Sequence, residues 1–66
     1  MKQIYNVLVY ESYTAKMESL LNGFRVGLND WDRTRVFELQ NERVVNYTIA
    51  CDDETYQSII NALNNV

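Results

Sequence analysis

Two kinds of hydrophobic pattern, alternating and helical, divide the chain into a strand, a helix, two strands and a helix. In the first segment, residues 2–10, both faces of the expected strand are largely apolar. One face carries Tyr5, Val7 and Val9, and the other carries Ile4, Leu8 and Tyr10. A strand with two apolar faces is typical of the inside of a sheet. We therefore expect this strand to lie in the sheet interior rather than at an edge, and either of its faces could be the one left uncovered.

A helical stripe follows, with apolar residues at the i, i+4, i+7, i+8 and i+11 positions: Tyr13, Met17, Leu20, Leu21 and Phe24. Ser12 or Thr14 is expected to cap this helix, because a hydroxyl accepts hydrogen bonds from the N–H groups of the first turn. Gly23 could end the helix and leave residues 24–28 to form a short strand. Alternatively, the helix continues to Gly27, because Leu28 also fits the stripe. The unbroken stripe favours the longer helix.

The middle of the chain predicts a turn and then a hairpin. Residues 29–32, with the sequence Asn-Asp-Trp-Asp, have the composition of a turn. Residues 33–40 and 44–51 alternate as two strands. Paired residues share a face, so we expect Leu39 opposite Val45 and Phe37 opposite Tyr47. That register requires a loop with an odd number of residues, for example residues 41–43.

The last segment predicts a helix that begins at the acidic residues 52–54, which suit the positive end of a helix. Its apolar stripe consists of Tyr56, Ile59, Ile60 and Leu63. The fold class expected for residues 1–66 is a single small α+β domain. It would contain a three-stranded antiparallel sheet in β-α-β-β-α order, with both helices packed on one face. This element order resembles a ferredoxin-like split β-α-β unit without its last strand.

Composition adds a stability argument that favours self-association. The chain has 66 residues, one cysteine and no histidine. A chain near 60 residues buries only about 60% of the surface that its unfolded form exposes. Small domains compensate with disulfides, metals or oligomerisation, and one cysteine without histidine supplies neither of the first two. We therefore expect a homo-oligomer, specifically a dimer.

The sequence offers little for catalysis. Without histidine, Cys51 has no base to activate it, and we expect it to pack as a buried thiol at the end of a strand. The acidic groups at residues 30–32 and 52–54 lack the spacing of a calcium loop, so a turn and a helix start explain them. We expect a protein that is not an enzyme and that uses no cofactor or metal. The chain shows no signal-peptide pattern and no long apolar run, so we expect a cytoplasmic protein without a membrane span.

One alternative is a sheet that binds single-stranded nucleic acid. Arg33, Arg35 and Arg43 gather positive charge in the hairpin, near the aromatic residues Phe37 and Tyr47. The RNA-recognition signature is not present, and the formal net charge of −3 opposes binding to phosphates. A second alternative is a dimeric ligand-sensing module of ferredoxin-like order.

The favoured hypothesis is a small non-enzymatic protein-binding module that acts by surface contact with a host protein or with itself. Two helices on one sheet face leave the other face open, and large exposed apolar patches mark interaction sites. The expected partner-binding residues lie in the 29–32 turn and the hairpin: Trp31, Asp30, Asp32, Arg33, Arg35, Val36, Val44, Asn46 and Thr48. The size, acidity and asparagine content resemble those of small phage and mobile-element proteins that inhibit or modulate a host protein.

Overall fold

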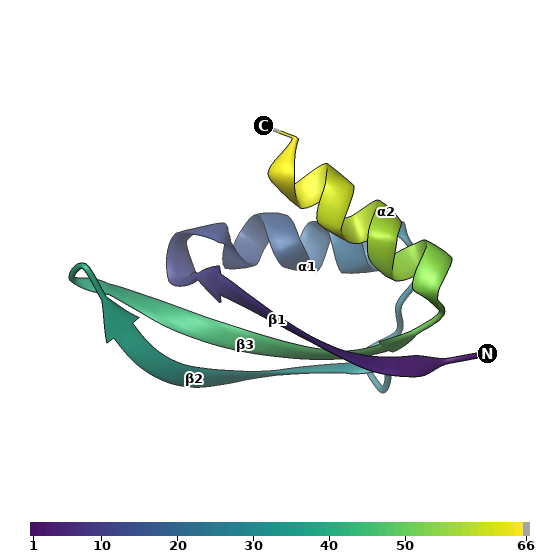
Figure 1. The fold of residues 1–66 in the computed structure, drawn as a ribbon, viewed down its shortest axis with the longest axis horizontal. Coiled ribbons are helices and arrows are strands. Elements are labelled where there is room, and N and C mark those ends of the chain that lie inside the picture. The colour runs from purple at the N-terminus through teal and green to yellow at the C-terminus, as the bar shows by residue number, and fades with distance from the viewer. Residues whose placement is uncertain (66) are drawn as a thin grey trace.

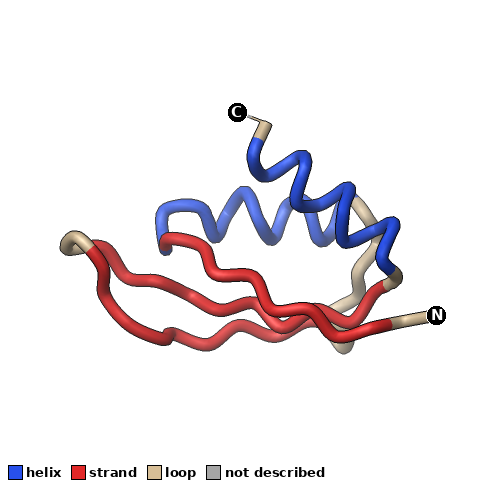
Figure 2. The backbone as a smooth tube through the Cα atoms, in the orientation of Figure 1, coloured by secondary structure: helices blue, strands red, loops and turns tan. Residues whose placement is uncertain are grey.

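The computed structural model describes residues 1–65. A three-stranded sheet forms one layer, and two helices cover one of its faces (Figure 1, Figure 2). The strands are β1 (Gln3–Tyr10), β2 (Trp31–Leu39) and β3 (Glu42–Cys51), and the helices are α1 (Thr14–Gly23) and α2 (Asp53–Asn64). A short 3-10 turn, η1 (Glu11–Tyr13), joins β1 to α1. The expected α+β class, element order and antiparallel sheet are confirmed.

The order of strands in the sheet is β1-β3-β2, so the central strand is β3. β3 pairs antiparallel with both neighbours, which makes β1 and β2 parallel to each other but separated by β3. The expectation that the first strand lies inside the sheet is wrong, because β1 occupies an edge. The apolar pattern on both sides of β1 therefore has a cause other than an interior position.

The core lies between the sheet and the helices. β1 contributes Val7 and Val9, and the central strand contributes Val45, Tyr47, Ile49 and Cys51. The helices close the core with three fully buried side chains, Met17, Leu21 and Ile59. The predicted stripes of both helices thus supply the core. At the rim of the stripe of α1, Tyr13 and Phe24 remain 44% and 40% exposed.

Helix α1 ends at Gly23, four residues before the end that the stripe favoured. The N–H of Val26 donates to the Leu21 carbonyl over 2.8 Å, and the N–H of Arg25 donates to the Asn22 carbonyl over 3.1 Å. This pair of bonds is a Schellman motif, which satisfies carbonyl groups at a helix end. The left-handed position of the motif is occupied by Arg25, with φ of 62°, and not by a glycine. The motif turns Val26 back into the core, and residues 24–28 form neither a helix nor a strand.

The start of α1 also differs from the expectation. Neither Ser12 nor Thr14 caps it, because η1 precedes the helix and the N-cap residue is Tyr13, without a side-chain cap. The Thr14 hydroxyl instead donates to the Glu11 carbonyl over 2.8 Å.

The β2–β3 hairpin has a different register from the predicted one. Its turn contains two residues, Gln40 and Asn41, with φ of 54° and 64°. Positive φ at both positions is the type I′ geometry, whose twist suits a hairpin. Leu39 therefore lies opposite Glu42, and Phe37 lies opposite Val44. The prediction of a three-residue loop, with Leu39 and Phe37 opposite Val45 and Tyr47, is wrong.

A bulge in β2 reconciles this turn with the rest of the sheet. The pairing shifts between Arg35, which lies opposite Val45, and Phe37, which lies opposite Val44. Val36 is the extra residue, and an extra residue reverses the alternation of side chains beyond it. The two-residue turn therefore places Phe37 and Leu39 on the face of the sheet opposite to the one that the sequence predicted, and the bulge returns Arg35, Arg33 and Trp31 to the helix-covered face.

Candidate interaction surface

The helices leave one face of the sheet uncovered, and we call it the open face. From β1 it carries Ile4, Asn6, Leu8 and Tyr10, because Val7 and Val9 point to the core. From β3 it carries Glu42, Val44, Asn46, Thr48 and Ala50, and from β2 it carries Asp32, Thr34, Phe37 and Leu39. The sequence had left both faces of the first strand possible, and the structure decides between them.

Apolar side chains gather on the open face at its hairpin end. We define the hairpin-end patch as Leu8, Tyr10, Phe37, Leu39 and Val44. Leu8, Phe37 and Leu39 are 58%, 45% and 48% exposed, whereas Val44 is buried beneath its neighbours. The patch lines a hollow of about 460 Å³ that also reaches Tyr13 and Leu63. Three large apolar side chains that are each about half exposed form a surface typical of interaction sites.

The centre of the open face is polar and internally hydrogen-bonded. The Thr48 hydroxyl donates to Asn6 Oδ1 over 3.0 Å. The Asn46 amide donates to the same Asn6 oxygen and to Thr48 Oγ1, both over 3.3 Å. The two bonds to Asn6 join β3 to β1, so the cluster stabilises the pairing of these strands and separates the hairpin-end patch from Ile4.

Charge on the open face is sparse and acidic. Within residues 1–65 the charged members of this face are Asp32 and Glu42. Glu42 Oε1 accepts a hydrogen bond from the Ser12 N–H over 3.2 Å, and Asp32 Oδ1 accepts one from the Arg33 N–H over 2.8 Å. Both carboxylates therefore accept hydrogen bonds from backbone N–H groups, and the part of the open face between them is uncharged.

Four of the residues that the sequence selected as partner-binding lie together on the open face: Asp32, Val44, Asn46 and Thr48. Arg33 and Arg35 belong to the opposite face, where they lie across from Tyr47 and Val45. Val36 is at the bulge and is 50% exposed. Asp30 lies in the turn before β2, where its carboxylate pairs with Lys2 Nζ over 3.1 Å. The predicted residues therefore do not form one surface.

Trp31 is not in a turn, as the sequence predicted, but is the first residue of β2, and Asp32 follows it in the same strand. The Trp31 ring packs against the core, with its centroid 5.7 Å from that of Tyr47 and a tilt of 42°. Its partial burial comes from this contact, so the structure gives Trp31 a packing role.

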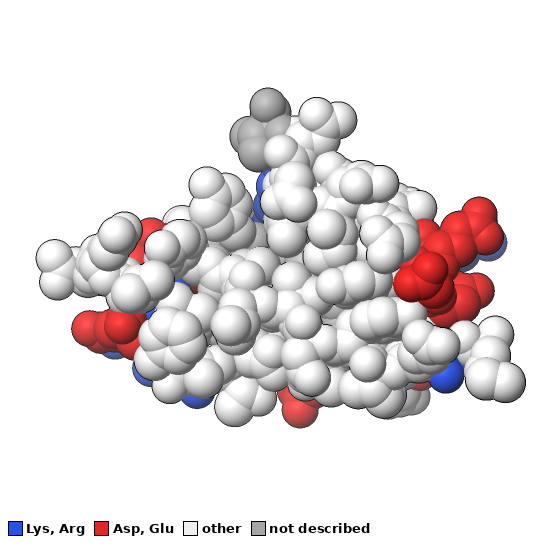
Figure 3. All heavy atoms as spheres, in the orientation of Figure 1, with Lys and Arg blue, Asp and Glu red and all other residues white. Residues whose placement is uncertain are grey.

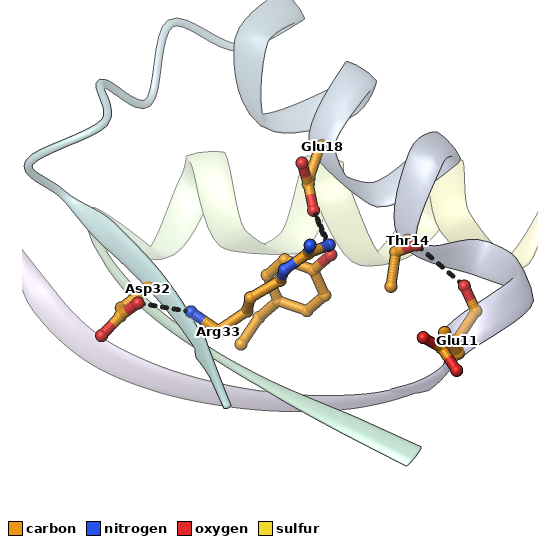
Figure 4. Close-up of polar contacts among 6 residues, drawn as sticks. Glu11, Thr14, Glu18, Asp32 and Arg33 are labelled. Atoms are coloured by element: carbon orange, nitrogen blue, oxygen red, sulfur yellow. Dashed lines mark hydrogen bonds and ion pairs between the residues drawn. The ribbon is translucent and has the colours of Figure 1, made fainter. Parts of the chain in front are cut away.

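Arg33 takes part in a polar cluster between the sheet and α1 (Figure 4). Its Nη1 forms an ion pair with Glu18 Oε2, and the Tyr47 hydroxyl donates to the same oxygen over 2.8 Å. Burial raises the pKa of Tyr47 to about 12, and the hydrogen bond to Glu18 acts in the same direction. The Tyr47 hydroxyl therefore stays protonated, and its hydrogen bond to the Glu18 carboxylate, which also pairs with Arg33, fixes the packing of α1 against the sheet.

The other residues considered for catalysis or metal binding are Cys51 and the acidic residues 52–54, and both lie at the ends of elements of the fold. Cys51 is buried at the end of β3, and burial raises the pKa of its thiol, with a further contribution from Asp52 and Asp53. Residues 52–54 begin α2, as expected, with Asp52 as the N-cap residue. Within residues 1–65, no three histidine, cysteine or acidic side chains are grouped closely enough to hold a metal ion.

The sequence did not identify Phe37 and Leu39 as residues of the open face, whereas Leu8 belonged to one of the two faces of the first strand that it left possible. The signal that could have found the first two is the pair Gln40-Asn41, because a two-residue turn at this point fixes Leu39 opposite Glu42. The bulge at Val36 has no comparable signal in the sequence.

No helix in the described part of the chain combines the length and apolar character needed to cross a membrane. Searches of protein-family models, of curated proteins and of solved structures find no match to this chain.

Proposed function

We propose that this protein is a non-enzymatic protein-binding module whose hairpin-end patch receives apolar side chains of a partner polypeptide. The observation that carries the proposal is the exposure of Leu8, Phe37 and Leu39 around one hollow at the hairpin end of the sheet, which the end of α2 also lines. Covering apolar surface contributes about 25 cal/mol per Å². A partner that fills the hollow would therefore gain free energy of binding without any change in the fold.

The charges near the patch specify the chemistry of the partner. Glu42 lies beside the patch and Asp32 lies at the far end of the same face. The chain as a whole has a formal net charge of −3. Complementary charge accelerates association and selects among partners. We therefore expect an apolar segment flanked by lysine or arginine, presented by a larger protein that this chain inhibits or modulates.

Binding of single-stranded nucleic acid is the weaker proposal. It requires aromatic and basic side chains on one surface. Phe37 and Tyr10 belong to the open face, whereas Arg33 and Arg35 belong to the helix-covered face, and Arg33 pairs with Glu18. The charges on the open face are carboxylates, which repel phosphates.

A selection from a random peptide display library tests the proposal with a defined probe. We expect the selected peptides to share an apolar centre with flanking lysine or arginine. The double variant Phe37→Ser/Leu39→Ser should raise the Kd of these peptides at least about tenfold, because it removes two of the three exposed apolar side chains of the patch.

Leu28→Ser is the matched control. Leu28 is 84% exposed but lies in the segment between α1 and β2, away from the open face. This variant should bind the peptides as the wild-type chain does, and both variants should melt cooperatively. The proposal fails if the library yields no enriched peptides, or if the double variant binds them with unchanged affinity.

A further inference from the structure

The two edges of the sheet are protected very differently. β2 carries four charged residues, Asp32, Arg33, Arg35 and Glu38, and it is interrupted by the bulge at Val36. Charges and bulges are the usual devices that prevent an edge strand from pairing with another chain. β1 contains no charged residue, no proline and no glycine, and it pairs with β3 through eight consecutive residues. β1 thus has the composition of an interior strand although it lies at an edge.

One hydrogen bond on the β2 side of β3 shows which backbone groups of β1 point outward from the sheet. The Ala50 N–H donates to the Asp30 carbonyl, in line with the β2 ladder, over 2.7 Å. Backbone groups of successive residues alternate between the two neighbours of a strand. The odd-numbered residues of β3 therefore bond to their partners in β1, which are Gln3, Tyr5, Val7 and Val9. The N–H and C=O groups of Ile4, Asn6 and Leu8 consequently point away from the sheet.

Helix α2 continues this uncharged surface above β1. Tyr56 stacks on Tyr5 of β1, with ring centroids 3.9 Å apart and an angle of 5° between the planes. Leu63, two turns along α2, lines the hollow together with Val9 of β1. Tyr56, Ile60 and Leu63 are only partly buried, and α2 has no charged residue from Tyr56 to its end. Figure 3 shows a broad uncharged region in this view, with most of the visible charged groups toward its left and right ends.

From these observations we infer that β1 pairs antiparallel with β1 of a second copy of this chain. The two three-stranded sheets would join into one continuous sheet around a two-fold axis. The inference does not rest on the proposed function, because it uses the backbone edge of β1, although Leu8 belongs both to this edge and to the hairpin-end patch. It also explains why an edge strand is apolar on both faces.

The side chains select one register for this pairing. If Asn6 faces Asn6 of the second copy, Ile4 lies opposite Leu8, and Tyr5 lies opposite Val7. Apolar side chains then meet apolar ones, and the two amides meet each other. The pairs 4–8, 6–6 and 8–4 are the residues whose backbone groups point outward, so each can exchange two hydrogen bonds. A register centred on Val7 would instead place Asn6 opposite Leu8.

Charge is also compatible with a second copy as the occupant. The register centred on Asn6 buries no charged residue of β1, because β1 contains none. It places Lys2, which pairs with Asp30 of its own chain, opposite Tyr10 of the second copy, so no two like charges lie opposite each other along the paired strands.

The first test measures the mass and the amide exchange of the wild-type chain. Sedimentation equilibrium should give twice the chain mass of 7.8 kDa as concentration rises. In the dimer, the amides of Ile4, Asn6 and Leu8 should exchange slowly, and dilution should remove this protection while Tyr5 and Val7 remain protected. A chain that stays monomeric into the millimolar range, or a dimer whose three outward amides exchange freely, would overturn the inference.

The variant Asn6→Asp is designed to disrupt the β1–β1 pairing and to leave the fold of the monomer unchanged. Asp retains the oxygen that accepts hydrogen bonds from Thr48 and Asn46, so the monomer should fold as before. In the dimer, two carboxylates would face each other at the axis and should raise the dissociation constant at least about tenfold. Asn22→Asp, an identical charge change at an exposed position of α1, should leave the dimer intact.

The outcomes separate the two proposals. A dimer that persists in Asn6→Asp would show that another surface forms it. A dimer that persists in Phe37→Ser/Leu39→Ser, while peptide binding is lost, would support both proposals. A wild-type monomer that still binds the selected peptides would overturn the dimer and leave the proposed function standing.

Discussion

The hydroxyl of Tyr47 donates a hydrogen bond to Glu18 Oε2 over 2.8 Å, and the guanidinium of Arg33 pairs with the same oxygen. Tyr47 belongs to β3, Arg33 to β2 and Glu18 to α1, so one carboxylate joins three elements. The Tyr47 ring itself is fully buried, and its hydroxyl reaches the edge of the core. This contact holds α1 against the side of the sheet that β2 forms.

Tyr47→Phe should lower the free energy of unfolding by about 1–2 kcal/mol, because it removes a hydrogen bond to a charged group while the ring remains in place. Urea denaturation followed by circular dichroism measures the change. Tyr13→Phe is the control, since Tyr13 is 44% exposed and should alter stability by less than about 0.5 kcal/mol. Equal effects of the two substitutions would contradict the anchoring role of Tyr47.

The same phenol predicts a loss of stability in alkaline solution. The pKa of Tyr47 rises from 10.0 to about 12 on folding. The unfolded chain therefore releases the proton first, and stability that is complete below about pH 10 declines as the pH rises toward 12. Melting temperatures across this range should fall more steeply for the wild-type chain than for Tyr47→Phe. The comparison isolates Tyr47 from Tyr5, whose pKa is also raised, first by burial and then by its hydrogen bond to Asp53. Parallel curves would refute the prediction.

Trp31→Ala should destabilise the fold by about 2 kcal/mol, because it removes an aromatic side chain that packs against Tyr47 and the core. This expectation replaces the one from the sequence, which placed Trp31 in a turn as an anchor for a partner. Thermal melting should show a decrease on the order of 10 °C, whereas Leu28→Ala should change it little. An unchanged melting temperature for Trp31→Ala would restore the role of a surface anchor.

Arg25→Gly should raise the free energy of unfolding by about 0.5–1 kcal/mol. Arg25 has a left-handed backbone at the end of α1, and glycine adopts this conformation without the steric cost of a side chain. Arg25→Ala keeps that cost and removes only the guanidinium and its stem, so its effect should lie within about 0.5 kcal/mol of zero. If Arg25→Gly is the less stable of the two variants in urea denaturation, the Schellman assignment is wrong.

Local patterns in the sequence determined the elements. The helical spacing of Met17 with Leu21, and of Tyr56 with Ile60, was enough to predict both helices, because burial on one side imposes a period of 3.6 residues. The alternation around Tyr47 and Ile49 predicted the most buried strand for a similar reason. The acidic residues 52–54 predicted the start of α2. From these elements followed the class, the order and the placement of both helices on one face.

The composition of the open face depended on details that the alternation of apolar residues does not express. The type I′ turn at Gln40-Asn41 places Phe37 and Leu39 on the uncovered side, although their alternation alone favours the core side, and the bulge at Val36 keeps Arg33 on the helix-covered side. The end of α1 depended on Val26 turning back onto Leu21 through backbone hydrogen bonds, with Arg25 in a position usually occupied by glycine. These are choices between conformations of similar local energy, and tertiary packing decides them.

The sequence by itself determined which segments form helices and strands, because the period of apolar residues is a local property of the chain. Only the tertiary structure decided which strand lies at the centre. β1 and β3 are both rich in apolar residues, and the order β1-β3-β2 follows from long-range pairing of β3 with both other strands. That order leaves β1, apolar on both faces and uncharged, at an edge of the sheet. The surface available to a second chain is therefore a product of topology. An apolar pattern indicates that apolar groups cover a strand, but it does not specify whether the same chain or another chain supplies them.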